Sequence, residues 1–149
     1  MIRLIGSILL LSCSALSSWE CRRKQKEKIT ALSRCLELVE HARMQIEYFS
    51  APLQQIFATF KSGEWKSVEQ LCDWIKGNEN MEDEEADLML AWLEGLGGGY
   101  KEDQLIRCSF TKEKLSGIAE ARKAELANKI KANDVISFLS SMSIILLLL

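Results

Sequence analysis

The chain has 149 residues, 48% of them hydrophobic and 27% charged, which is the length of one ordinary domain. Its formal net charge of −2 argues against a nucleic-acid binder that relies on positive charge, and its single histidine excludes a metal site built from several histidines. Nearly all charged residues lie between two uncharged segments, residues 4–19 and 135–149. The sequence therefore predicts two apolar ends around a polar middle region.

The first apolar segment predicts a membrane anchor helix over residues 1–20. Counted from Met1 to Trp19, a helix rises about 28 Å, close to the roughly 30 Å hydrocarbon core of a bilayer. Because a basic cluster follows the apolar run and only Arg3 precedes it, a retained anchor is favoured over a cleaved signal peptide. A lipoprotein attached through Cys13 is a third interpretation. The residues expected at the membrane interface are Trp19, Arg22, Arg23 and Lys24.

The middle region, residues 21–133, is expected to be entirely helical. Apolar residues recur at helical spacing after the anchor, and no glycine or proline interrupts residues 7–51, so the two segments are predicted to form one long helix. Pro52 breaks this helix, because proline removes a backbone donor and clashes with the preceding turn. Ser50 is expected to cap a second helix that ends at Ser62-Gly63.

Three further helices are predicted after this point. One runs over residues 64–76 and stops at Gly77-Asn78. The next opens in the acidic run of residues 79–87, whose carboxylates favour the positive end of a helix dipole. Its predicted inner face is Ala86, Leu90, Leu93 and Leu96, and Gly97, Gly98 and Gly99 close it. The last helix starts near Lys101 and runs toward the tail.

The tail, residues 134–149, is predicted to be a second membrane helix. Its apolar run rises only about 22 Å, so spanning requires a thinner bilayer or a neighbouring helix. A buried core helix is the alternative interpretation. Basic residues flank both apolar ends on the side of the middle region, so the positive-inside rule places that region in the cytoplasm. Five cysteines without a CxxC pair agree with reduced thiols in that compartment.

The sequence contains no recognisable active site. His41 has no identifiable nucleophile or metal partner and is expected to be an exposed helix residue. Residues 95–99 are rich in glycine, but no strand precedes them and no Gly-Lys-Ser/Thr follows, so a helix stop is predicted rather than a phosphate loop. The acidic run lacks the EF-hand spacing that calcium requires. Cys72 and Cys108 lie on apolar stripes and are expected to be buried. We therefore expect no enzyme activity, catalytic residue, metal, cofactor or small-molecule substrate.

Several short motifs are spread over nearly the whole chain. They begin at Leu4-Ile5-Gly6-Ser7, are clearest at Ile46-Glu47-Tyr48 and Pro52-Leu53, and return at Leu93, Leu96-Gly97, Gln104 and the hydrophobic C-terminus. Together they resemble the stage III sporulation protein AB family of endospore-forming bacteria. The chain departs from the family pattern at Gln45 and Tyr100, where acidic residues are usual, and its middle region is shorter than is typical.

The resemblance implies a protein of the mother-cell membrane that acts in the channel-like apparatus facing the forespore. The helical domain of this family is similar to the cytoplasmic domains of platform proteins in type II secretion and type IV pilus systems. The implied partners are a companion secretion-type ATPase (stage III sporulation protein AA-like), other channel components and membrane lipids, with no nucleic acid.

The leading hypothesis is a non-enzymatic membrane platform that couples this ATPase to a transmembrane complex. The candidate docking residues are Glu82, Asp83, Glu84 and Glu85. A solvated helix start is the structural alternative for these carboxylates. The alternative function is a lipid-anchored extracytoplasmic binding protein attached through Cys13. A membrane enzyme is a third hypothesis, but the sequence contains no nucleophile–base pair that would support it.

Overall fold

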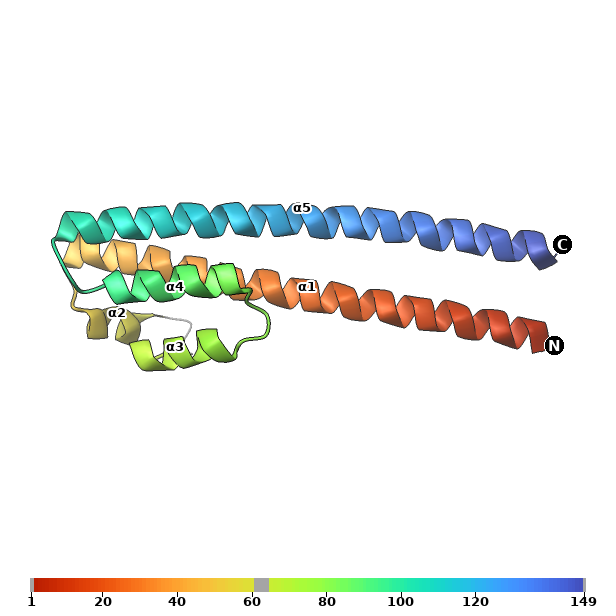
Figure 1. The fold of residues 1–149 in the computed structure, drawn as a ribbon, viewed down its shortest axis with the longest axis horizontal. Helices are drawn as coiled ribbons and strands as arrows, with labels where there is room; N and C mark the ends of the chain where they lie inside the picture. Colours follow the sequence, from red (N-terminus) through yellow and green to blue (C-terminus); the bar gives the residue numbers. More distant parts are fainter. Residues whose placement is uncertain (1, 61–64, 149) are drawn as a thin grey trace. The chain divides into compact units, whose positions relative to one another are not determined.

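The structure is a computed structural model that describes residues 2–60 and 65–148, and for residues 2–18, 21 and most of those after 133 it describes the backbone alone. Every regular element in these ranges is an α-helix, which confirms the predicted all-α class. In chain order the helices are α1 (Ile2–Phe49), α2 (Leu53–Thr59), α3 (Val68–Gly77), α4 (Asp83–Gly95) and α5 (Lys101–Leu148), as Figure 1 shows.

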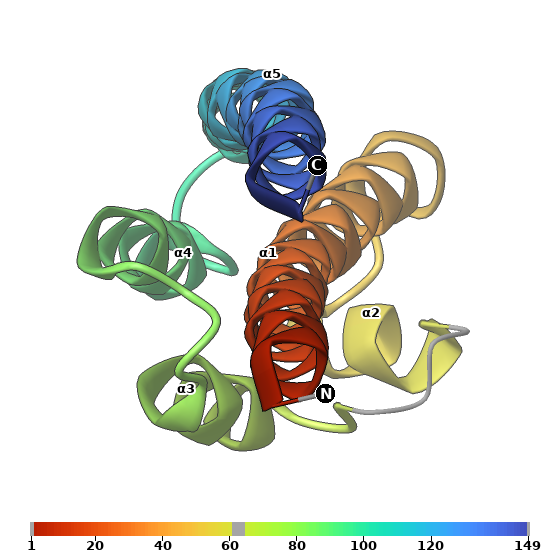
Figure 2. The same ribbon diagram turned by 90° about the vertical axis from the view of Figure 1, so that its right-hand side faces the viewer.

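The chain divides into two compact units. The first, which we call the core unit, is Lys28–Glu120, and the second combines Met1–Glu27 with Ala121–Leu149. Helices α1 and α5 each contribute a segment to both units. Within the core unit, α2, α3, α4 and the first part of α5 lie around the second part of α1 (Figures 1 and 2). Every side chain that the structure describes as buried belongs to the core unit.

The core-unit segment of α1 presents one continuous apolar stripe. Its buried residues recur at intervals that keep them on one side of the helix, as burial against neighbouring helices requires. They are Ala31, Leu32, Cys35, Leu38, Val39, Ala42 and Ile46. The prediction of one long helix before Pro52 is confirmed, because α1 runs without interruption to Phe49.

Ser50 ends α1 and does not cap α2, contrary to the prediction. It adopts a left-handed conformation with a φ of 48°, and its N–H donates to the Ile46 carbonyl at 3.3 Å. A left-handed residue after the last turn is a common way to end a helix. The N-cap of α2 is instead Pro52, whose ring fixes φ at −66°. The predicted end of this helix at Ser62-Gly63 lies outside the described residues.

Helix α3 begins later than its predicted start at residue 64. Ser67 caps it, because the Ser67 Oγ accepts a hydrogen bond from the Gln70 N–H at 3.3 Å. Trp65 precedes the helix yet is 2% exposed, and its ring centroid lies 4.7 Å from that of Trp74. Trp65 therefore reaches the core from the segment before α3. Its apolar spacing is the same as that of a helical residue, so the spacing alone placed Trp65 inside the helix.

The buried face of α4 is only partly the predicted one. Leu93 and Leu96 are buried as expected, but Ala86 and Leu90 are half-buried, and the buried set also contains Glu85, Met89 and Trp92. The turn after α4 follows the prediction, because Gly97 and Gly99 have φ values of 86° and 87° that favour glycine. In α5 the fully or nearly buried stripe is Cys108, Thr111, Leu115 and Ala119.

Membrane helices were predicted over residues 1–20 and 134–149. Most side chains of these two apolar ends, including that of Cys13, lie outside the described side chains. Across the residues that are described, no helix has the length and apolar character needed to cross a bilayer.

Candidate docking site

The four carboxylates predicted to dock a partner have different surroundings at the start of α4. Glu85 is 1% exposed, and its Oε2 accepts a hydrogen bond from the Glu82 backbone N–H at 3.0 Å. Glu82 is exposed, and its Oε1 lies 3.3 Å from Lys28 Nζ. Asp83 and Glu84 are exposed, and no ion pair in the described part of the chain engages them. Glu85 therefore leaves the candidate set, because a partner cannot reach a carboxylate buried in the core unit.

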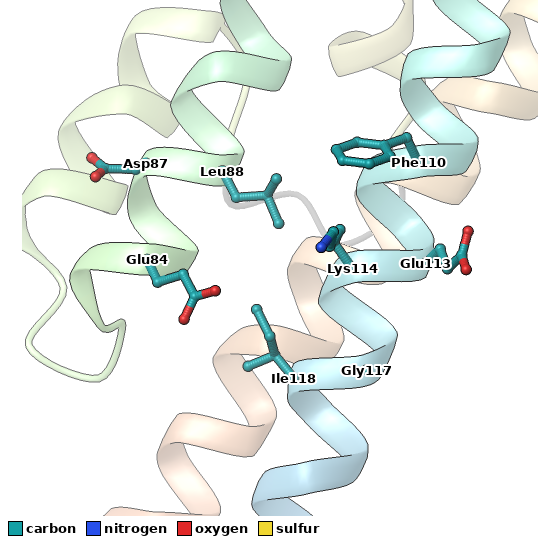
Figure 3. Close-up of a pocket in the computed structure, with 8 residues that line it drawn as sticks. All are labelled: Glu84, Asp87, Leu88, Phe110, Glu113, Lys114, Gly117 and Ile118. Carbon is teal, nitrogen blue, oxygen red and sulfur yellow. The ribbon is translucent and has the colours of Figure 1, made fainter.

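A groove of about 710 Å³ runs between α4 and α5, next to the exposed Glu84. Side chains from both helices point toward it (Figure 3); they are Glu84 and Leu88 of α4 and Phe110, Lys114 and Ile118 of α5. Asp87 and Glu113 lie at its two outer edges, and Gly117 completes the lining (Figure 3). The groove therefore places an apolar strip between carboxylates that belong to different helices.

The lining of this groove carries an excess of negative charge. The lining contains three carboxylates, those of Glu84, Asp87 and Glu113, and one ammonium group, that of Lys114. The Lys114 Nζ lies 5.8 Å from the centroid of the Phe110 ring, an arrangement in which the ring face attracts the cation. No ion pair among the described residues neutralises the three carboxylates. A cationic partner would therefore find them available.

This groove was not predicted from the sequence. The signal available was Phe110, a large apolar residue that lines the groove and lies off the buried stripe of Cys108 and Leu115. Ile106, four residues earlier, also lies off this stripe but does not line the groove. Ile106 is 66% exposed and Phe110 is 54% exposed. A contiguous apolar patch, rather than a single exposed residue, indicates an interaction surface, and Phe110 shares the groove lining with Leu88 and Ile118.

A network of ion pairs joins α1 to α5 elsewhere in the core unit. The Glu40 carboxylate lies 2.8 Å from Lys112 Nζ and 3.2 Å from Arg43 Nη2. Arg43 also reaches Glu47 at 3.1 Å, one helical turn further on. The hydrogen bonds from Lys112 and then Arg43 hold the pKa of Glu40 below its usual value. This network supports packing, because its charges are matched within the chain.

His41 is half-buried, not exposed as predicted. Its Nε2 lies 3.1 Å from Thr59 Oγ1, and its ring centroid lies 5.5 Å from that of Phe60. The Thr59 hydroxyl also donates to the Gln55 carbonyl at 2.8 Å. The pair of His41 and Thr59 therefore links α1 to α2.

The cysteines of the core unit differ in burial. Cys35 and Cys108 are fully buried, whereas Cys72 is half-buried. Burial raises the pKa of the Cys35 thiol to about 12, with a further contribution from the Glu85 carboxylate. Burial also raises the pKa of Cys108, whose Sγ accepts a hydrogen bond from the Trp92 indole at 3.4 Å. The expected burial is confirmed for Cys108 and is only partial for Cys72.

The residues predicted at the membrane interface lie on α1 in the second unit. Trp19 is 67% exposed, Arg23 and Lys24 are exposed, and Arg22 is half-buried. Arg23 Nε lies 2.9 Å from Glu27 Oε1 one turn away. Their contact with lipid stays a prediction.

Several of the short motifs from the sequence meet where the helices turn. Pro52, Leu53, Leu96, Gly97 and Gln104 line one cavity of about 360 Å³. Gln104 Nε2 donates to the Gly99 carbonyl at 3.5 Å. A Cβ added at Gly97 would lie 3.8 Å from Leu53 Cδ2. These motif residues therefore have a structural role, because they fix the turns after α1 and α4.

The described residues contain no cluster of three or more side chains suited to hold a metal ion. The fold and the groove define the class: an all-α protein with a packed helical core unit and an acid-lined groove between α4 and α5.

The family model of stage III sporulation protein AB matches residues 3–76, and the chain belongs to this family. The matched part covers α1 and α2 and nearly all of α3, so Leu93, Leu96-Gly97 and Gln104 lie beyond it. Comparisons with curated proteins and with solved structures returned no match. The expected likeness to type II secretion platform domains therefore stays a prediction.

Proposed function

We propose that this protein is a non-enzymatic membrane platform of the sporulation channel apparatus between mother cell and forespore. In this role the apolar ends anchor it in the mother-cell membrane, and the core unit lies in the cytoplasm. There it couples a companion secretion-type ATPase to the transmembrane complex. The family membership makes the sporulation role the natural context for the chain.

The observation that carries the coupling role is the exposed acidic start of α4. Asp83 and Glu84 are free of ion pairs in the described part of the chain, although each favours the positive end of the helix dipole. Charges that remain unmatched within a chain steer and fix a partner of opposite charge. Glu82 adjoins them but is already close to Lys28.

Co-purification of the full chain with the companion ATPase tests the coupling role. The double variant Asp83→Lys/Glu84→Lys should weaken ATPase capture at least about tenfold, which corresponds to about 1.4 kcal/mol of binding free energy. The matched control is Glu69→Lys/Asp73→Lys, which reverses two exposed carboxylates on α3 and should leave capture unchanged. Equal capture by wild type and the α4 variant would contradict the proposed coupling surface.

The cytoplasmic location is tested by labelling Cys72 in whole cells with a membrane-impermeant maleimide. In the chain with all its cysteines retained, and with the label on Cys72 read by mass spectrometry of the digest, we expect labelling of Cys72 only after the membrane is opened. Full labelling in intact cells would place the core unit outside, as the lipoprotein interpretation through Cys13 requires. Cys108 is a poor reporter of location, because it is fully buried.

A further inference from the structure

We propose that the groove between α4 and α5 receives an amphipathic helix of a partner protein, with an apolar stripe facing Gly117 and Phe110 and flanking lysine or arginine side chains facing the carboxylates. This inference rests on the proposed function, because it names the kind of partner element that the acidic surface binds. The shape of the groove, its charge and one glycine favour such a partner.

The shape of the groove suits a helix better than a small molecule. Small-molecule sites enclose most of their ligand and use a few converging polar groups to orient it. Here Glu84, Phe110 and Gly117 are exposed, so the lining lies open at the surface. An open apolar strip between two helices matches the grooves in which proteins bind amphipathic helices.

The charge of the groove selects a basic partner. Glu113 lies at its α5 edge, and Glu84 and Asp87 belong to α4, so a helix lying over Gly117 would have carboxylates on both sides (Figure 3). Lys114 is the one cation of the lining, and it lies over the Phe110 ring. The same carboxylates would repel an acidic helix and an anionic lipid surface.

Gly117 gives the third reason. It lies inside α5, where glycine is about 1 kcal/mol less favourable than alanine. A Cβ added at Gly117 would meet nothing within 4 Å, so packing within the chain does not require glycine there. Phe110 is seven residues earlier and therefore lies on the same side of α5, about two turns away. The missing side chain leaves space for another backbone to approach closely beside an exposed aromatic ring.

The test uses the full chain in nanodiscs of zwitterionic phosphatidylcholine and two dye-labelled peptides of about 14 residues, which as helices match the length of α4. One peptide combines a leucine stripe with lysines, and the other carries glutamates in place of the lysines. Fluorescence anisotropy, corrected with empty nanodiscs, should show that the leucine–lysine peptide binds at least about tenfold tighter than its acidic counterpart. Equal binding of the two peptides, or no binding of either, would overturn the proposal.

Variants locate the binding within the groove. Gly117→Leu fills the open space and should weaken binding of the leucine–lysine peptide at least about tenfold, whereas the adjacent exposed control Ser116→Leu should stay within about twofold of wild type. If circular dichroism shows that Gly117→Leu is misfolded, the double variant Glu84→Lys/Glu113→Lys tests the groove instead. This variant should bind the acidic peptide more tightly than the leucine–lysine peptide. Unchanged preference in that variant, or equal losses at Gly117 and Ser116, would rule out the groove.

The two proposals can fail separately. Peptide binding that depends on Gly117, together with no capture of the ATPase, would keep the groove and reject the ATPase as its partner. Capture of the ATPase that depends on Asp83 and Glu84, together with no peptide preference, would keep the platform role and reject the helix in the groove.

Discussion

At the scale of single residues, burial controls the chemistry of the thiols. A thiolate is the reactive form of cysteine, and burial disfavours it because the charge would leave water. The Cys35 pKa of about 12 and the raised pKa of Cys108 therefore describe two unreactive side chains. Cys72, being half-buried, is accessible to small reagents.

We predict that iodoacetamide modifies Cys72 in the native protein at pH 8 and modifies Cys35 and Cys108 at least about a hundredfold more slowly, because their thiolates are scarce and inaccessible. Mass spectrometry of the digested protein measures the modification of each cysteine, and a denatured sample supplies the maximum. Native labelling of Cys35 at the rate of Cys72 would contradict its described burial.

The pKa of Cys35 also affects stability at high pH. Its folded pKa lies above the unfolded value of 9.0, so ionisation favours the unfolded chain as pH rises from 9.0 toward about 12.

Glu40 gives a second prediction, at low pH. Its pKa is lowered by Lys112 and Arg43, so its contribution to stability is present above the unfolded value of 4.5 and is lost as pH falls through the folded pKa. Because these groups are partly exposed, Glu40→Gln should reduce the free energy of unfolding at pH 7 by no more than about 1 kcal/mol. Urea unfolding at pH 7 and pH 3 measures this difference, which should shrink at pH 3. Glu37→Gln, at an exposed position of the same helix, is the control.

At the scale of the elements, glycines with different surroundings should respond differently to alanine. Gly117 lies in a helix with open space around its Cβ position, so Gly117→Ala should raise the free energy of unfolding by about 0.5–1 kcal/mol. Gly97 has a φ of 86°, which alanine adopts only with strain, so Gly97→Ala should lower the free energy of unfolding by about 1–2 kcal/mol. Chemical denaturation of the two variants tests both signs, and a loss of stability at Gly117 would show that the chain itself uses that glycine.

How much of these elements the sequence predicts depends on the range of the interactions. The long α1, the break at Pro52 and the glycine turn after α4 follow from local backbone chemistry, and all were predicted. Glu85 was predicted as a surface docking residue. It is buried instead, and its carboxylate accepts a hydrogen bond from the Glu82 backbone N–H. The groove was missed because it depends on how α4 and α5 pack, which periodicity within one helix does not encode.

At the scale of the whole molecule, the core is concentrated between residues 28 and 120. All described buried side chains lie there, from Ala31 to Ala119, and none lies in the second unit. The hydrophobic free energy of folding scales with buried apolar area, so the described packing that stabilises the fold belongs to the core unit.

We therefore predict that a fragment of residues 28–120 folds by itself. It should unfold cooperatively by heat with an enthalpy of roughly 65 kcal/mol, the value expected from its length. A shorter fragment, residues 40–120, is the control, because it lacks five buried residues of α1 and should show no cooperative transition; they are Ala31, Leu32, Cys35, Leu38 and Val39. Calorimetry and circular dichroism measure both fragments. If residues 28–120 melt without a cooperative transition, the second unit contributes to folding, and the groove between α4 and α5 depends on more of the chain than the core unit alone.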